Sequence, residues 1–157
     1  MMKTLWSRTS AAALVAILAA SPVCAETSPA PMLTLAEAKS VAARAERAAA
    51  EKKVDVAIVI VNREGRVILS ERMDGVSFVN LALAEKKAVT TAATGVPTSI
   101  LEKATDGGKP SFLSVPEISV IGGAVPLLRG ERVIGGIGIS GGTTEDDEKI
   151  ATAGAGS

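Results

Sequence analysis

The sequence predicts a single domain of the α/β class, in its α+β form, with a mainly antiparallel sheet flanked by helices. Three observations indicate this. Apolar residues recur at helical spacing near the start, in the middle and at the end of the chain. Runs rich in β-branched and apolar residues lie between these segments. Most of the predicted strands are separated by connections of hairpin length, and short connections join antiparallel neighbours.

The first predicted helix runs from Thr34 to about Lys53. Thr34 and Glu37 have the spacing of a capping box, in which the two side chains bond the free amides of the first turn. The apolar face that follows is mostly alanine, which permits close approach to a sheet.

A hairpin and a second helix follow. Residues 54–61 (VDVAIVIV) are nearly all apolar, which predicts a strand covered on both faces. Residues 62–65 (NREG) are typical of a turn with glycine in the left-handed region, and residues 66–73 form the return strand. The second helix is predicted over 77–93.

The second half of the chain contains a short helix, a loop and three short strands. Gly95 is expected to end the second helix. A short helix over 97–104 and an exposed loop over 105–117 come next. Glycine-bounded strands are then predicted over 118–123, 124–130 and 131–140, before a last helix that begins at Thr143 or Thr144 and runs to about Ala153.

The N-terminus has the pattern of a secretory signal peptide over residues 1–25. Lys3 and Arg8 precede an apolar run, and small residues before Ala25 suit cleavage there. We therefore expect a periplasmic or secreted protein with a tail over 26–33 and one domain over 34–157. The apolar run is too short to span a bilayer, so no membrane span is expected after cleavage. Cleavage also removes Cys24, the one cysteine.

The composition excludes several functions. The chain has no His and no Tyr, which rules out a Ser-His-Asp triad, a His-ligated zinc and a His-ligated haem. Its 17 Lys and Arg balance 17 Asp and Glu, and signal cleavage removes two of the basic residues. A slightly acidic mature chain argues against nucleic acid or an anionic membrane as a partner.

Gly136, Gly138 and Gly141 have the letter spacing of a dinucleotide-binding loop, but the context is wrong. Such a loop follows the first strand of a βαβ unit, whereas this one ends the last strand. One interpretation is that the glycines let a helix or a neighbouring subunit approach a buried strand. Another is that free amides in Ser140-Gly141-Gly142 line a small pocket, beside acidic residues that hold a hard cation.

Four segments together resemble the GlcG/HbpS family of haem-binding or haem-degrading domains. They are RMDG (72–75), KAVTTAATGVPT (87–98), GGAVPL (122–127) and GGIGISGGTTEDDEKIA (135–151). The resemblance implies a profilin-like fold and a homo-oligomer, often an octamer. It also implies haem, iron or another divalent metal as a cofactor, and a small anionic ligand as a partner. Some relatives hold haem iron through His, which this chain lacks.

Arg72, Met73 and Asp74 form the first candidate site. One interpretation is structural, with an Arg72–Asp74 pair bracing the turn while Met73 packs inward. In the functional interpretation, Arg72 pairs with a ligand carboxylate or a haem propionate. Because His, Tyr and Cys are absent, Met73 and Met32 are the soft side chains left to ligate haem iron.

The second candidate site combines Lys87 with the loops at Gly122-Gly123 and Ser140-Gly141-Gly142. Lys87 is interpreted first as a solvated or subunit-contacting charge, and alternatively as a cation that neutralises an acidic ligand. The leading hypothesis for function is an exported ligand-binding accessory protein. The alternatives are a small enzyme acting on haem or a short hydroxy acid, and a structural oligomeric partner of a sensor or transporter.

Overall fold

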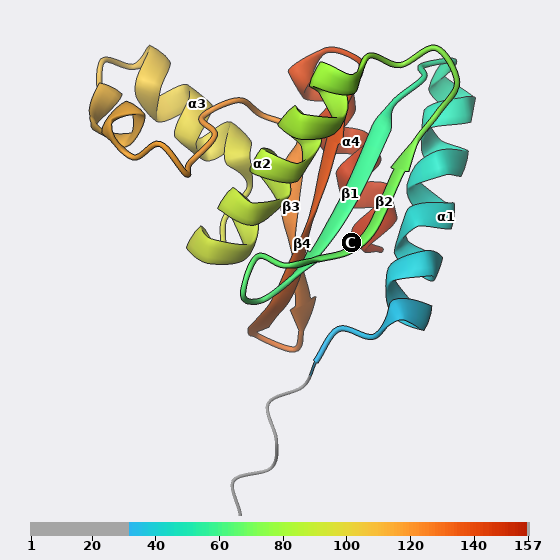
Figure 1. Cartoon of the computed structure of the whole chain (residues 1–157). Coiled ribbons are helices and arrows are strands. Elements are labelled where there is room, and N and C mark those ends of the chain that lie inside the picture. Colours follow the sequence, from blue (N-terminus) through green and yellow to red (C-terminus); the bar gives the residue numbers. More distant parts are fainter. Residues whose placement is uncertain (1–31, 157) are drawn as a thin grey trace, which may run out of the picture.

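The computed structural model describes residues 32–156, so the predicted signal peptide and most of the predicted tail lie outside the described residues. Four helices and a four-stranded sheet form an α+β domain, which confirms the predicted class (Figure 1). The sheet order is β2-β1-β4-β3, and every neighbouring pair is antiparallel. The elements are α1 (Leu35–Lys52), β1 (Ala57–Asn62), β2 (Val67–Arg72), α2 (Phe78–Thr94), α3 (Thr98–Asp106), the 3-10 helix η1 (Pro110–Ser114), β3 (Ala124–Arg129), β4 (Arg132–Ser140) and α4 (Thr144–Ala155).

Helices cover both faces of the sheet. α2 packs on one face, and α1 and α4 pack on the other (Figure 1). Alternate residues of β1 enter two separate apolar clusters: Ile58 and Ile60 pack with α1 and α4, whereas Val59 packs with α2. This confirms the prediction that β1 is covered on both faces.

Local signals placed the ends of several elements correctly. The Thr34–Glu37 capping box is present, and Thr34 begins α1 as its N-cap. Gly65 adopts φ +74° in the β1–β2 turn, and Gly95 adopts φ +74° at the end of α2. Thr143 caps α4, with its hydroxyl accepting a hydrogen bond from the Asp146 N–H.

The predicted strand over 118–123 is wrong, because the described sheet contains only β3 and β4 after that point. Ser119 donates its N–H to the Thr90 hydroxyl at 2.8 Å, and Ile121 donates its N–H to the Ser119 hydroxyl at 3.3 Å. Side chains thus satisfy this backbone in place of a neighbouring strand. Gly123, with φ +120°, then turns the chain into β3.

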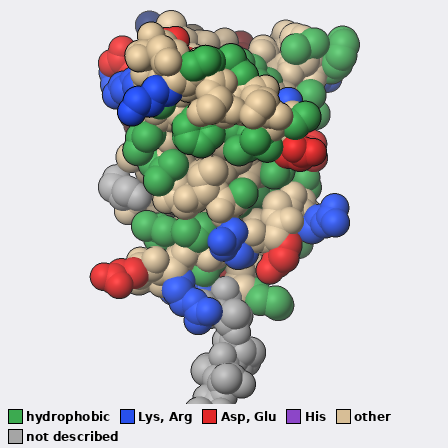
Figure 2. Space-filling view, turned by 90° about the vertical axis from the view of Figure 1, so that its left-hand side faces the viewer, with side chains coloured by type: hydrophobic (Ala, Val, Ile, Leu, Met, Phe, Trp, Pro, Cys, Tyr) green, Lys and Arg blue, Asp and Glu red, His purple; other side chains and the backbone are tan. Residues whose placement is uncertain are grey.

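α3 and η1 form an arm that projects from the body of the domain (Figure 1). Figure 2 shows hydrophobic side chains exposed on the face that includes α2 and this arm. Within residues 32–156, no helix combines the length and the apolar character needed to cross a membrane. The exposed large hydrophobic side chains of the arm and its connection to β3 are Ile100, Phe112, Leu113, Val115 and Ile121.

Candidate functional site

A buried ion pair lies at the end of the sheet where β4 finishes, and its partners are Lys87 and Asp147. Lys87 comes from α2 on one face, and Asp147 comes from α4 on the other (Figure 1). Lys87 Nζ lies 3.1 Å from Asp147 Oδ2 and donates a hydrogen bond of 2.9 Å to the Ile139 carbonyl. We call Lys87, Asp147 and the loop at Gly122-Gly123 the glycine-loop centre.

The first interpretation of Lys87, as a solvated or subunit-contacting charge, is wrong. The residue is only 1% exposed, among the largest fully buried side chains of the described chain. Its neighbours on the helix surface are Ala84 and Thr91, which are also buried. Lys87 therefore belongs to the face of α2 that packs on the sheet, and its ammonium group reaches the sheet's end.

The loop before β3 is shaped to admit the lysine. A Cβ added at Gly123 would lie 2.6 Å from Lys87 Nζ and 2.7 Å from Asp147 Cβ, so a side chain there would collide with the ion pair. A Cβ at Gly122 would lie 2.6 Å from Glu102 Oε2. Gly123 thus makes room for the buried ion pair, and Gly122 makes room for the half-buried Glu102 side chain, which gives both glycines a role beyond turning the chain.

Asp147 is the residue that sequence reasoning missed. Carboxylates at the start of a helix usually interact with the helix dipole, which describes Asp146 better than Asp147. Asp146 bonds Lys52 at 2.7 Å near the surface, whereas Asp147 points inward and also accepts the Gly142 N–H at 2.9 Å. The available signal was its spacing: Asp147 lies three residues before Ile150, which is buried, and residues three apart share one face of a helix.

In the loop Ser140-Gly141-Gly142, the last of the amides is not free. The Gly142 N–H is bonded to Asp147, and the Ser140 hydroxyl bonds Asn80 Oδ1 at 3.2 Å. A Cβ at Gly141 would come within 2.9 Å of Val56 Cα. The loop therefore packs closely against the start of β1, in agreement with the packing interpretation of these glycines.

Arg72, Met73 and Asp74 lie at the same end of the sheet. Arg72 and Ser140 both pair with Ala57, from opposite sides of β1, so two strand spacings, roughly 10 Å, separate their backbones. The structure thus brings all nine predicted site residues to one end of the domain. They form two groups there, with β1 between them.

The predicted Arg72–Asp74 pair is wrong, because no ion pair joins these two residues in the described structure. Arg72 donates instead to the Val76 carbonyl. Met73 packs against both apolar clusters, and its sulfur accepts the Val56 N–H at 3.4 Å. These contacts favour the packing interpretation of Met73 over a role as an iron ligand.

Burial dominates the electrostatics of the glycine-loop centre. It lowers the pKa of the Lys87 ammonium below its ordinary value, and the Asp147 carboxylate opposes that shift. Within residues 32–156, no group of three or more acidic side chains is arranged to hold a metal ion, so these residues do not support the predicted cation site.

Three cavities contain none of the nine predicted residues in their linings, although Glu102 and Thr144, which line the largest, lie against Gly122. The largest, about 590 Å³, separates α3 from α4 and is lined by polar side chains, including Glu102, Glu148 and Lys149. A second, about 370 Å³, lies between α1 and β3. The third, about 350 Å³, lies at the opposite end of the sheet, between the β1–β2 and β3–β4 turns.

The sheet, its three covering helices and the buried lysine–aspartate pair define a small α+β domain. The model of the family described as haem-degrading protein, HbpS-like, matches residues 33–156. The chain therefore belongs to this family, which confirms the resemblance stated above.

Individual relatives agree with the family match. The chain is 31% identical over 123 residues to an uncharacterized 15.0 kDa protein of the dhaT–dhaS intergenic region of Citrobacter freundii, covering 76% of this chain and 87% of that protein. A double mutant of Streptomyces reticuli HbpS superposes with a TM-score of 0.76 at 30% identity, covering 94% and 97% of the two chains. The PduOC–haem complex gives a TM-score of 0.73 at 28% identity, covering 80% and 94%.

Proposed function

We propose that this protein binds haem, or a related small anionic ligand, as an accessory protein. The observation that carries the proposal is the family match over nearly the whole described domain. A structural relative of the same fold was solved as a haem complex, at 28% identity. Because fold alone does not determine function, the proposal also depends on whether this chain's own side chains suit haem.

The described residues offer one free thioether for haem iron. Histidine, the ligand in many haem proteins, is absent from the chain. Met73 is engaged with Val56 and the core, whereas Met32 is 79% exposed. Haem supplies redox chemistry when bound, and the protein's part would be to hold its carboxylates and to offer a thioether sulfur to the iron. We expect a lower affinity for haem than in relatives that supply a histidine.

A haemin titration followed by Soret absorption tests the proposal. We expect a saturable and shifted band with the purified protein, because a protein-bound porphyrin experiences a fixed, less polar environment than free haemin. A spectrum that stays identical to free haemin at all protein concentrations would remove haem from the proposal. Adding a reductant separates binding from turnover: a stable band indicates a binding protein, and steady loss of the band indicates the alternative of an enzyme acting on haem.

We also propose that the protein is exported and forms a homo-oligomer. The signal-peptide pattern over residues 1–25 supports export, and the exposed apolar side chains of the α3–η1 arm support association. Native mass spectrometry of protein recovered from a periplasmic extract tests both at once. We expect subunits that begin at Glu26 and a complex of several copies. A monomer with an intact N-terminus would contradict both parts.

A further inference from the structure

We propose that the cavity between the two hairpin turns binds the anionic, ring-shaped ligand, with Arg63 and Arg132 bonding its carboxylates and Met32 facing its centre. We call it the hairpin cavity; its volume is about 350 Å³, within the range of small-molecule sites. This inference rests on the proposed function and gives that function a place. It lies at the opposite end of the sheet from the glycine-loop centre.

The walls of the hairpin cavity are held in position by the fold. Asn62, in the wall, accepts the Arg66 N–H at 2.8 Å through its side chain and the Gly65 N–H at 3.0 Å through its carbonyl. The floor contains Leu33 and Ile134, each 6% exposed and part of the α1–α4 apolar cluster. A rigid turn above an apolar floor suits a flat ligand with polar groups at its edge, because little ordering accompanies binding.

The two arginines give the hairpin cavity its charge. Arg63 donates one N–H to the Ala92 carbonyl at 2.7 Å, which fixes the guanidinium while leaving its other donors for a ligand. Arg132 begins β4 and is exposed. With Glu64 as the one acidic residue in the lining, the cavity carries more positive than negative charge. Guanidinium groups bond carboxylates in pairs of parallel hydrogen bonds.

Met32 is placed by its neighbour. Leu33 is buried, and a Cβ added at Gly135 of β4 would lie 3.1 Å from its side chain, so Leu33 anchors the chain against the sheet. Met32 then stands at the mouth of the hairpin cavity with 79% of its surface exposed. A thioether in that position is a ligand of the haem-iron type, and it is free of the contacts that engage Met73.

The other two cavities suit an anion less well. The cavity between α3 and α4 is lined by three glutamates and two lysines, so its net charge repels a dianion. In the cavity between α1 and β3, Arg129 is paired with Glu37, and Arg44 donates to the Gly154 carbonyl at 2.9 Å.

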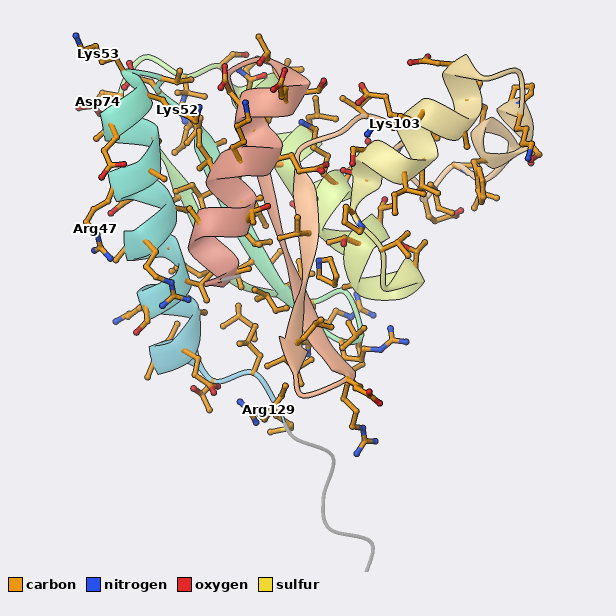
Figure 3. All side chains as sticks on the ribbon, turned by 180° about the vertical axis from the view of Figure 1, so that it is seen from behind. Arg47, Lys52, Lys53, Asp74, Lys103 and Arg129 are labelled. Carbon is orange, nitrogen blue, oxygen red and sulfur yellow. The ribbon has the colours of Figure 1, made fainter. Side chains whose placement is uncertain are left out.

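Lys and Arg side chains lie at the lower end of the face that Figure 2 shows, and Figure 3 shows Arg129 at the same end of the molecule.

The test compares haemin with metal-free protoporphyrin IX, which has the same carboxylates and no iron. We expect Arg132→Gln to weaken binding of both by about tenfold, the loss of one charge-assisted contact. Met32→Leu should weaken haemin alone and alter its Soret band, because only haemin contains iron to ligate. Arg66→Gln is the control: Arg66 lies in the β1–β2 turn, as Arg63 does, but does not line the cavity. The affinity of this variant for both probes should stay within about twofold. Circular dichroism verifies folding of each variant.

The outcomes separate the site from the function. If the wild type binds haemin and both Arg132→Gln and Met32→Leu bind it equally well, the site is overturned and the function stands. If only metal-free porphyrin binds, and Arg132→Gln weakens it, the site stands and haem is not the ligand. If the wild type binds neither probe, site and function are both overturned.

Discussion

Lys87→Met is expected to lower the free energy of unfolding by about 3–5 kcal/mol, the usual cost of removing one partner from a buried ion pair. The variant leaves the Asp147 carboxylate 2% exposed with no cation beside it. It also removes the donor to the Ile139 carbonyl. Both groups would then be buried and incompletely bonded. Urea unfolding measures the change.

Two further variants make the Lys87 prediction specific. Lys149→Met removes an exposed lysine that pairs with Glu145 along the helix, and should change the free energy of unfolding by less than about 0.5 kcal/mol. Lys87→Met combined with Asp147→Leu should be more stable than Lys87→Met alone, because an apolar pair does not strand a charge. If Lys87→Met alone were as stable as the wild type, water would have to reach Asp147, and the glycine-loop centre would not be closed to solvent.

Gly138→Ala is expected to destabilise the protein by about 3 kcal/mol, at the upper end of the usual overpacking cost. A Cβ at this position would overlap the Ala84 carbonyl and lie 2.7 Å from the Ala88 N–H, so the methyl group meets the backbone of α2. Backbone cannot rotate aside as the end of a side chain can. α2 would have to move off β4, exposing the alanine face that packs there.

Gly107→Ala is the control for Gly138→Ala, and thermal unfolding compares the stability of the two variants with that of the wild type. Gly107 lies after α3, at an ordinary φ of −75°, and its added Cβ would lie 3.1 Å from an exposed helix end. We expect less than about 1 kcal/mol of change there. Equal effects at the two glycines would mean that α2 adjusts easily, and that the small residues of β4 are not required for its approach.

Features with local causes could be predicted from the sequence. The Thr34–Glu37 capping box, the turn at Gly65 and the end of α2 at Gly95 each depend on residues a few positions apart. The packing role of Gly136 and Gly138 followed from their position on a buried strand. The order of the strands in the sheet was not among the predictions, because it depends on contacts between distant segments.

The errors have a common physical origin. Lys87 and Asp147 are 60 positions apart, and nothing in either neighbourhood indicates the other. The segment 118–123 has strand-like residues, but Thr90, from a different element, bonds its backbone. Met73 was selected by elimination, and its contact with the Val56 N–H requires the fold to be known. The local sequence pattern does not indicate contact partners that come from distant parts of the chain.

The ion pair between α2 and α4 also sets an order of events during synthesis. Residues 144–155 leave the ribosome after α2 and all four strands, and Asp147 lies among them. Until it arrives, α2 cannot settle on the sheet without isolating the Lys87 ammonium from water and from any counterion. A nascent or truncated chain that ends before α4 is therefore expected to remain open, and the domain closes only once α4 is present.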